Sequence, residues 1–166
     1  MNHSAVTIED LLADFDETAM RWKQFFASNP GASLIPTDIA KSENIGALVW
    51  HLYAASLRLS MRLLGEPVGD FEGMSPVRNL DAAWELQSRA SVNLRRFLET
   101  TNEESLDEIF RFQTRVAGEI AASRRKICLH VFVHTIRHLA QIGPIVRQHG
   151  FTPDWPQDIL FSHAIR

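Results

Sequence analysis

The stretch LHVFVHTIRHLAQ, residues 129–141, decides how this chain of 166 residues is interpreted. Its three histidines, His130, His134 and His138, are spaced four residues apart. Because an α-helix completes a turn in about 3.6 residues, side chains four positions apart stand above one another on one face. Two stacked imidazoles can bind one metal ion, so the stretch predicts a helix that carries metal ligands.

Helical periodicity extends on both sides of this stretch, from about residue 121 to residue 148. Gly150 is expected to end that helix, and Gly143-Pro144 inside it predicts a kink, because proline removes a backbone hydrogen bond. Earlier segments show the same spacing of apolar residues, and we expect three further helices, over residues 7–28, 43–64 and 79–99. Four long helices joined by linkers of unequal length predict an all-α fold, a four-helix bundle.

Local signals indicate where these helices begin and end. Thr7 with Asp10 has the form of an N-terminal cap for the first helix. Ser42 is expected to cap the second helix, and Gly65 is expected to end it. A linker rich in proline and glycine, residues 66–78, should be a loop.

Residues 101–118 have no single interpretation. A short helix over residues 103–108 and an extended arm over residues 110–116 are both compatible with the pattern. The tail from Phe151 onward carries several apolar side chains, and we expect it to pack against the helices.

Composition excludes several classes of protein. The chain is 45% hydrophobic and 22% charged, a composition typical of one globular domain spanning residues 1–166. Its net charge is −3 and it has no block of like charge, so the charge pattern does not indicate a nucleic-acid binder. The first residues lack the pattern of a signal peptide, and no apolar run approaches the roughly 18 residues that span a bilayer. With a single cysteine, Cys128, the chain fits a reducing interior, so we expect a cytoplasmic protein that does not bind membranes.

A third metal ligand is expected from another helix, and His51 is the best candidate. It lies in the apolar run IGALVWHLYAA, residues 45–55, and its neighbours on the helical wheel include three alanines, which leave space beside the imidazole. Arg58 lies about 20° from His51 on the same wheel, two turns along. A cation that faces inward needs a partner, either a buried carboxylate or an anionic group of a substrate.

Three histidines with one coordination position open are the pattern of a catalytic metal site rather than a structural one. Zinc, nickel, copper, iron and manganese all accept imidazole ligands to varying degrees. Such an ion lowers the pKa of a bound water or a bound thiol. Cys128 lies roughly 120° from His134 on the wheel and is expected to be a small core residue rather than a ligand.

Several side chains near these ligands carry two interpretations each. His130 shares the stripe and is expected to line the pocket, and Gln141 either bonds a ligand histidine or contacts another helix. Arg58 either binds a substrate anion or forms a salt bridge, and Trp50 lines the pocket or belongs to the core. Acidic residues of the first helix are expected on a solvated face, and three other histidines are expected in solvent; these residues are Asp10, Asp14, Glu17, His3, His149 and His163.

The two histidine motifs together resemble the DinB/YfiT-like superfamily. The segment from His130 to Gln141 is similar to that family's fourth-helix signature, and Val49-Trp50-His51-Leu52 is similar to its second-helix motif. The resemblance covers nearly the whole chain in the order and spacing of helices. It implies an up-down-down-up four-helix bundle, often a homodimer, with nickel or zinc held by His51, His134 and His138. The family's usual His-Arg-Gly-Gln ending reads His138-Leu139-Ala140-Gln141 here, so the roles of its arginine and glycine do not carry over.

The resemblance also implies an activity. Family members with a known activity include metal-dependent transferases that attach a low-molecular-weight thiol to an electrophile, and a thiol-dependent isomerase. A thiol-dependent transferase acting on a small molecule is therefore the leading hypothesis. A metal-dependent hydrolase ranks lower, since no glutamate lies between His134 and His138. A non-catalytic, stress-related metal-binding protein is the remaining alternative.

Overall fold

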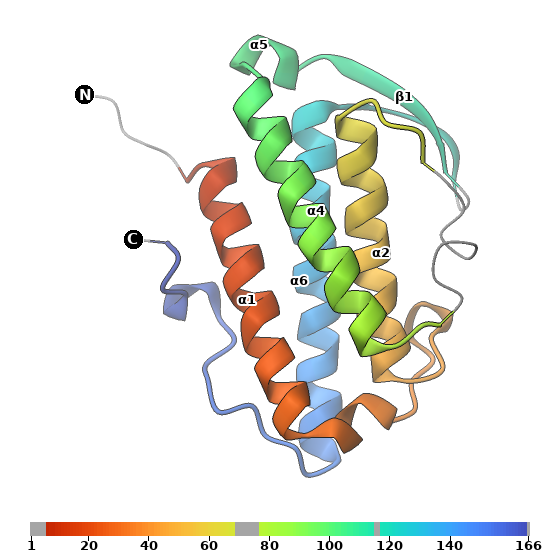
Figure 1. Ribbon diagram of the computed structural model, residues 1–166, viewed down its shortest axis with the longest axis vertical. Helices are drawn as coiled ribbons and strands as arrows, with labels where there is room; N and C mark the ends of the chain where they lie inside the picture. The colour runs from red at the N-terminus through yellow and green to blue at the C-terminus, as the bar shows by residue number, and fades with distance from the viewer. Residues whose placement is uncertain (1–5, 69–76, 115–116, 166) are drawn as a thin grey trace.

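The computed structural model describes residues 6–68, 77–114 and 117–165. Four long helices make up most of it: α1 (Ile8–Ser28), α2 (Ile45–Leu63), α4 (Leu80–Thr100) and α6 (Arg124–Gln148). They lie side by side, and α2 and α4 run in the same direction, opposite to α1 and α6 (Figure 1). Helix α2 packs mainly against α4 and α6, which places it where a side chain can meet α6.

The helix ends follow local chemistry, with one correction. Thr7 and Asp10 form a reciprocal capping box at α1, as predicted. Ser42 does not cap α2: the Asn44 side chain accepts a hydrogen bond from the Ala47 amide at 2.9 Å, and Ser42 is buried instead. Asparagine caps a helix as well as serine does, so the preference for serine did not exclude a cap at Asn44, two residues later.

A two-stranded hairpin corrects the expectation of an all-α fold. Strand β1 (Ile109–Thr114) pairs antiparallel with β2 (Gly118–Ser123), after the one-turn helix α5 (Glu103–Leu106). Both alternatives for residues 101–118 are therefore present, one after the other. The start predicted for the fourth helix near residue 121 is wrong, because residues 121–123 belong to β2 and α6 begins at Arg124.

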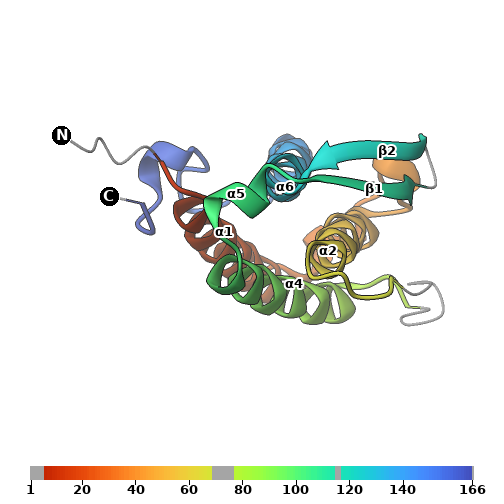
Figure 2. The same cartoon turned by 90° about the horizontal axis from the view of Figure 1, so that it is seen from above.

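The hairpin lies over the end of α2 and α6, as the view from above shows (Figure 2). The Arg62 guanidinium of α2 stands 4.6 Å from the centre of the Phe112 ring, which joins β1 to α2 by a cation–π contact. The described residues also form three short 3-10 helices, Pro30–Leu34, Ile39–Lys41 and Ile159–Phe161. Most of the predicted loop, residues 69–76, lies outside the described residues.

Gly65 and Gly150 end their helices as predicted, each with a positive φ, of 71° and 84°. Helix α6 continues through Gly143 and Pro144 to Gln148.

Among the described residues, no helix is both long enough and apolar enough to cross a membrane.

The C-terminal tail packs against α1, as predicted, and shows that the acidic face of α1 is not solvated. Trp155 packs edge-on against Trp22, with ring centres 5.4 Å apart. The Glu17 carboxylate accepts hydrogen bonds from the Ser162 hydroxyl at 3.0 Å and from two tail amides, those of His163 at 2.9 Å and Ala164 at 2.8 Å. Asp14 is buried as well. The prediction of a solvated face is wrong for these two acids, because residues more than a hundred positions away cover them.

The core between the helices supplies the first test. Leu94 of α4 is fully buried, whereas Val92 on the same helix is 62% exposed. We expect Leu94→Ala to lower the free energy of unfolding by about 2–5 kcal/mol, because it removes buried methyl groups and leaves a cavity. Val92→Ala, the matched control, should change it by less than about 0.5 kcal/mol. Urea denaturation followed by circular dichroism measures both, and equal effects would contradict this packing.

Candidate metal centre

Three histidines from two helices come together between α2 and α6. His51 of α2 faces His134 and His138 of α6, and one ring nitrogen from each lies within 4.8 Å of the others. The ring centres are 5.8 Å apart for His51 and His134, 5.4 Å for His51 and His138, and 4.6 Å for His134 and His138. Nitrogen ligands of a tetrahedral zinc ion stand about 3.4 Å apart, so small rotations of the rings would bring these three to bonding distance.

Small side chains let the two helices approach each other at this point. Ala54, one turn beyond His51, is buried, and the buried Ser56 lies within the next turn. The Ser56 hydroxyl oxygen is 3.3 Å from that of Thr135, the residue that follows His134. Each hydroxyl donates its proton to a backbone carbonyl of its own helix, that of Leu52 or Val131, so the two side chains meet as a close packing contact between α2 and α6 beside the histidines. The sequence analysis did not single out either residue.

Gln141 determines which nitrogen of His138 is available. Its side-chain oxygen Oε1 lies 2.8 Å from His138 Nδ1. An amide oxygen only accepts hydrogen bonds, so Nδ1 carries the proton and Nε2 keeps its lone pair. Of the two interpretations of Gln141, the structure shows the hydrogen bond to a histidine of the cluster.

The environment of His51 and His134 favours their neutral imidazoles. Burial first, and then the charges of His138, His130, His51 and Arg58, together lower the pKa of His134 to about 3. The pKa of His51 is also lowered, first by burial and then by His138, Arg58 and Arg78. A neutral imidazole has a free lone pair, so at neutral pH protons do not compete with a metal ion for these nitrogens.

Two arginines bring positive charge to the cluster. Arg58 and Arg78 both act electrostatically on His51. The Arg78 guanidinium also lies over the buried Trp50 ring, 5.2 Å from its centre, so Trp50 connects this arginine to α2. Arg58 and Trp50 were candidates from the sequence, whereas Arg78 was missed because it follows a stretch rich in proline and glycine with no periodicity.

His130 and Cys128 stand outside the group of three. His130 is exposed one turn from His134, with ring centres 5.5 Å apart, and it is not among the described residues whose nitrogens converge. Cys128 is buried, and burial raises the pKa of its thiol to about 12. A thiol with that pKa is not a reactive nucleophile at neutral pH.

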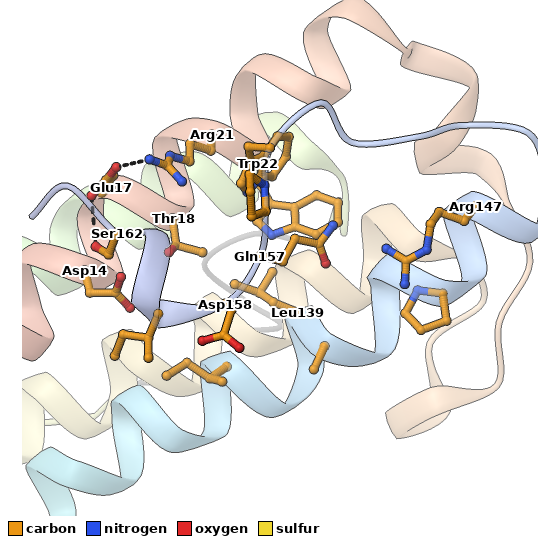
Figure 3. A pocket seen from close by; sticks show the side chains of 16 residues that line it. Asp14, Glu17, Thr18, Arg21, Trp22, Leu139, Arg147, Gln157, Asp158 and Ser162 are labelled. Carbon is orange, nitrogen blue, oxygen red and sulfur yellow. Dashed lines mark hydrogen bonds and ion pairs between the residues drawn. The ribbon is translucent and has the colours of Figure 1, made fainter.

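A separate pocket of about 220 Å³ lies on another side of α6, between α1, α6 and the C-terminal tail (Figure 3). Leu139 and Ala140 of α6 line it, and they directly follow His138 in the sequence. None of the three converging histidines lines this pocket.

Comparison with known proteins identifies the family of this chain. No curated protein matches the chain. The model of the DinB family matches residues 1–164, which is nearly all of the chain. The helical fold and the converging histidines of α2 and α6 agree with the family predicted from the two motifs. This chain belongs to the DinB family.

Proposed function

We propose that this protein is a metal-dependent transferase that joins a low-molecular-weight thiol to a small electrophilic molecule. The observation that carries the proposal is the convergence of His51, His134 and His138 on one point between α2 and α6. Three imidazole ligands suit zinc or nickel, and they leave at least one coordination position for another molecule. A divalent ion there would lower the pKa of a thiol that it binds, which makes the sulfur nucleophilic at neutral pH.

The charges around the histidines support a thiol rather than a neutral ligand. A deprotonated thiol is an anion, and Arg58 and Arg78 place positive charge beside His51. The same charges favour a thiol that carries carboxylates, because guanidinium groups bind carboxylates well. In the transfer, the sulfur forms a bond to an electrophilic carbon while the bond from that carbon to its leaving group breaks. The leaving group, chloride in the case of monochlorobimane, departs with the electron pair, and the thiol proton goes to solvent.

The ligand set argues against metal-dependent hydrolysis. Hydrolases of this kind commonly place a carboxylate beside the attacking water. Among the described residues, the charged groups that act on His51 and His134 are histidines and arginines, with no carboxylate. Thiol transfer does not need that carboxylate, since lowering the thiol pKa is enough.

Metal content tests the ligand assignment. We expect about one zinc or nickel ion per chain of wild type, and loss of that ion in His138→Ala, because two imidazoles hold a divalent ion much less tightly than three. His149→Ala, at the residue that directly follows the same helix, is the matched control and should keep the metal. Elemental mass spectrometry of purified, folded protein measures this. Retention of the metal in His138→Ala, or no metal in wild type after reconstitution, would contradict the assignment.

The hydrogen bond from His138 to Gln141 gives a second test. Gln141→Ala should weaken metal binding about tenfold, because groups that orient a ligand histidine contribute about 10–100-fold to affinity and this one is exposed. Gln141→Glu should restore the affinity, since a carboxylate also accepts a hydrogen bond from Nδ1. Gln148→Ala, at the exposed end of α6, is the control. Competition with a chelator measures the affinities, and equal values for all four proteins would rule out this role.

Activity is tested with the fluorogenic electrophile monochlorobimane. We expect metal-loaded wild type to accelerate its reaction with glutathione, and His138→Ala to lose the acceleration. Arg58→Gln should raise KM roughly tenfold for glutathione, which has two carboxylates, and leave KM for the uncharged 2-mercaptoethanol nearly unchanged. A panel of other low-molecular-weight thiols extends the assay. Failure of metal-loaded protein to accelerate the reaction of any of them would overturn the transferase proposal while leaving the metal centre intact.

A further inference from the structure

The pocket between α1, α6 and the tail contains a carboxylate that the fold does not neutralise. Asp14 of α1 lines this pocket and is only 7% exposed. Within the described part of the chain, its side chain makes no hydrogen bond and no ion pair. Figure 3 shows the carboxylate pointing from α1 into the space between α1 and α6, toward which Asp158 also turns. Burying a charged carboxylate without a partner is costly, so this geometry calls for a cation.

The other charged groups of the pocket do not supply that cation. Arg21 pairs with Glu17, and the Glu17 carboxylate also holds the tail through Ser162, His163 and Ala164. Arg147 lies at the opposite end of the pocket from Asp14 in Figure 3.

Asp158 adds a second carboxylate to the pocket. Its Oδ1 accepts a hydrogen bond from the Leu160 amide at 3.1 Å, the only hydrogen bond that its side chain forms among the described residues. Its Oδ2 is thus left for a ligand. Asp14 and Asp158 together therefore give this end of the pocket a net negative charge.

Apolar side chains form much of the remaining wall, with the polar Thr18, Gln157 and Ser162 among them. Trp22 and Trp155 contribute rings to it, and Leu139 and Pro144 contribute aliphatic surface. A volume of about 220 Å³ is below the roughly 300–1,000 Å³ typical of pockets for drug-sized ligands, so the occupant has few atoms. A divalent metal ion needs converging oxygen ligands, and the three acids of this pocket are not among the described groups whose ligand atoms converge.

We propose that this pocket binds a small organic cation, a protonated primary amine on a short alkyl chain. An ammonium group has three N–H donors, and two of them would meet the carboxylates of Asp14 and Asp158. The alkyl chain lies against the two tryptophan rings. The tail forms one wall, so the bound amine also holds the tail against α1. This site is distinct from the three histidines, and the proposal does not depend on the proposed transferase activity.

A titration with n-butylamine tests the proposal. We expect saturable one-site binding to wild-type protein by NMR, with and without the metal ion, and the same affinity in His138→Ala. Asp14→Asn keeps the size of the side chain and removes its charge, and it should weaken binding at least tenfold. Glu85→Gln, an exposed acid on α4, is the matched control and should leave the affinity unchanged. The uncharged 1-butanol should not bind at the same concentrations.

Three results would overturn the proposal. They are the absence of saturable n-butylamine binding, equal affinity in wild type and Asp14→Asn, and tighter binding of Mg²⁺ than of n-butylamine at the same residues. Circular dichroism establishes that each variant is folded. Should Asp14→Asn fail to fold, Asp158→Asn provides the same comparison, because Asp158 is exposed and asparagine keeps the hydrogen bond to the Leu160 amide.

Discussion

The contact between α2 and α6 is the constraint on which the candidate metal centre depends. A slip of one residue along either helix would move its side chains by about 1.5 Å and rotate them by about 100°. His51 would then no longer face His134 and His138. The small side chains of Ser56 and Thr135, whose hydroxyl oxygens are 3.3 Å apart, pack tightly at this point, and a slip would replace them with larger side chains. The position of the three histidines relative to one another therefore depends on helix packing beside them.

Much of this centre could be predicted from the sequence because its signals are local. The spacing of His134, His138 and Gln141 is set by the geometry of a single helix, and the structure shows the expected neighbours. His51 required one further step, the inference that a histidine within an apolar run faces another helix. Arg78 was missed because no periodic pattern fixes the direction of a side chain in a loop.

The wrong predictions share a physical cause, which is contact between distant parts of the chain. Residues 121–123 continue the helical pattern, yet they pair with residues 109–111 to form the hairpin. Asp14 and Glu17 have the spacing of a solvated face, yet the tail covers them. In both cases tertiary partners override a local preference, and a single sequence does not show which partners those are.

The two halves of the metal centre are separated by about half the length of the chain, since one ligand is on α2 and two are on α6. During synthesis His51 leaves the ribosome long before His134, so a three-histidine site does not exist until most of the chain has been made. Closing so long a loop costs conformational entropy, and the packing of the helices offsets that cost before any ion binds. Metal loading at this site would therefore come late in the life of the molecule, and an ion bound early by the emerging chain would be held by His51 without its partners.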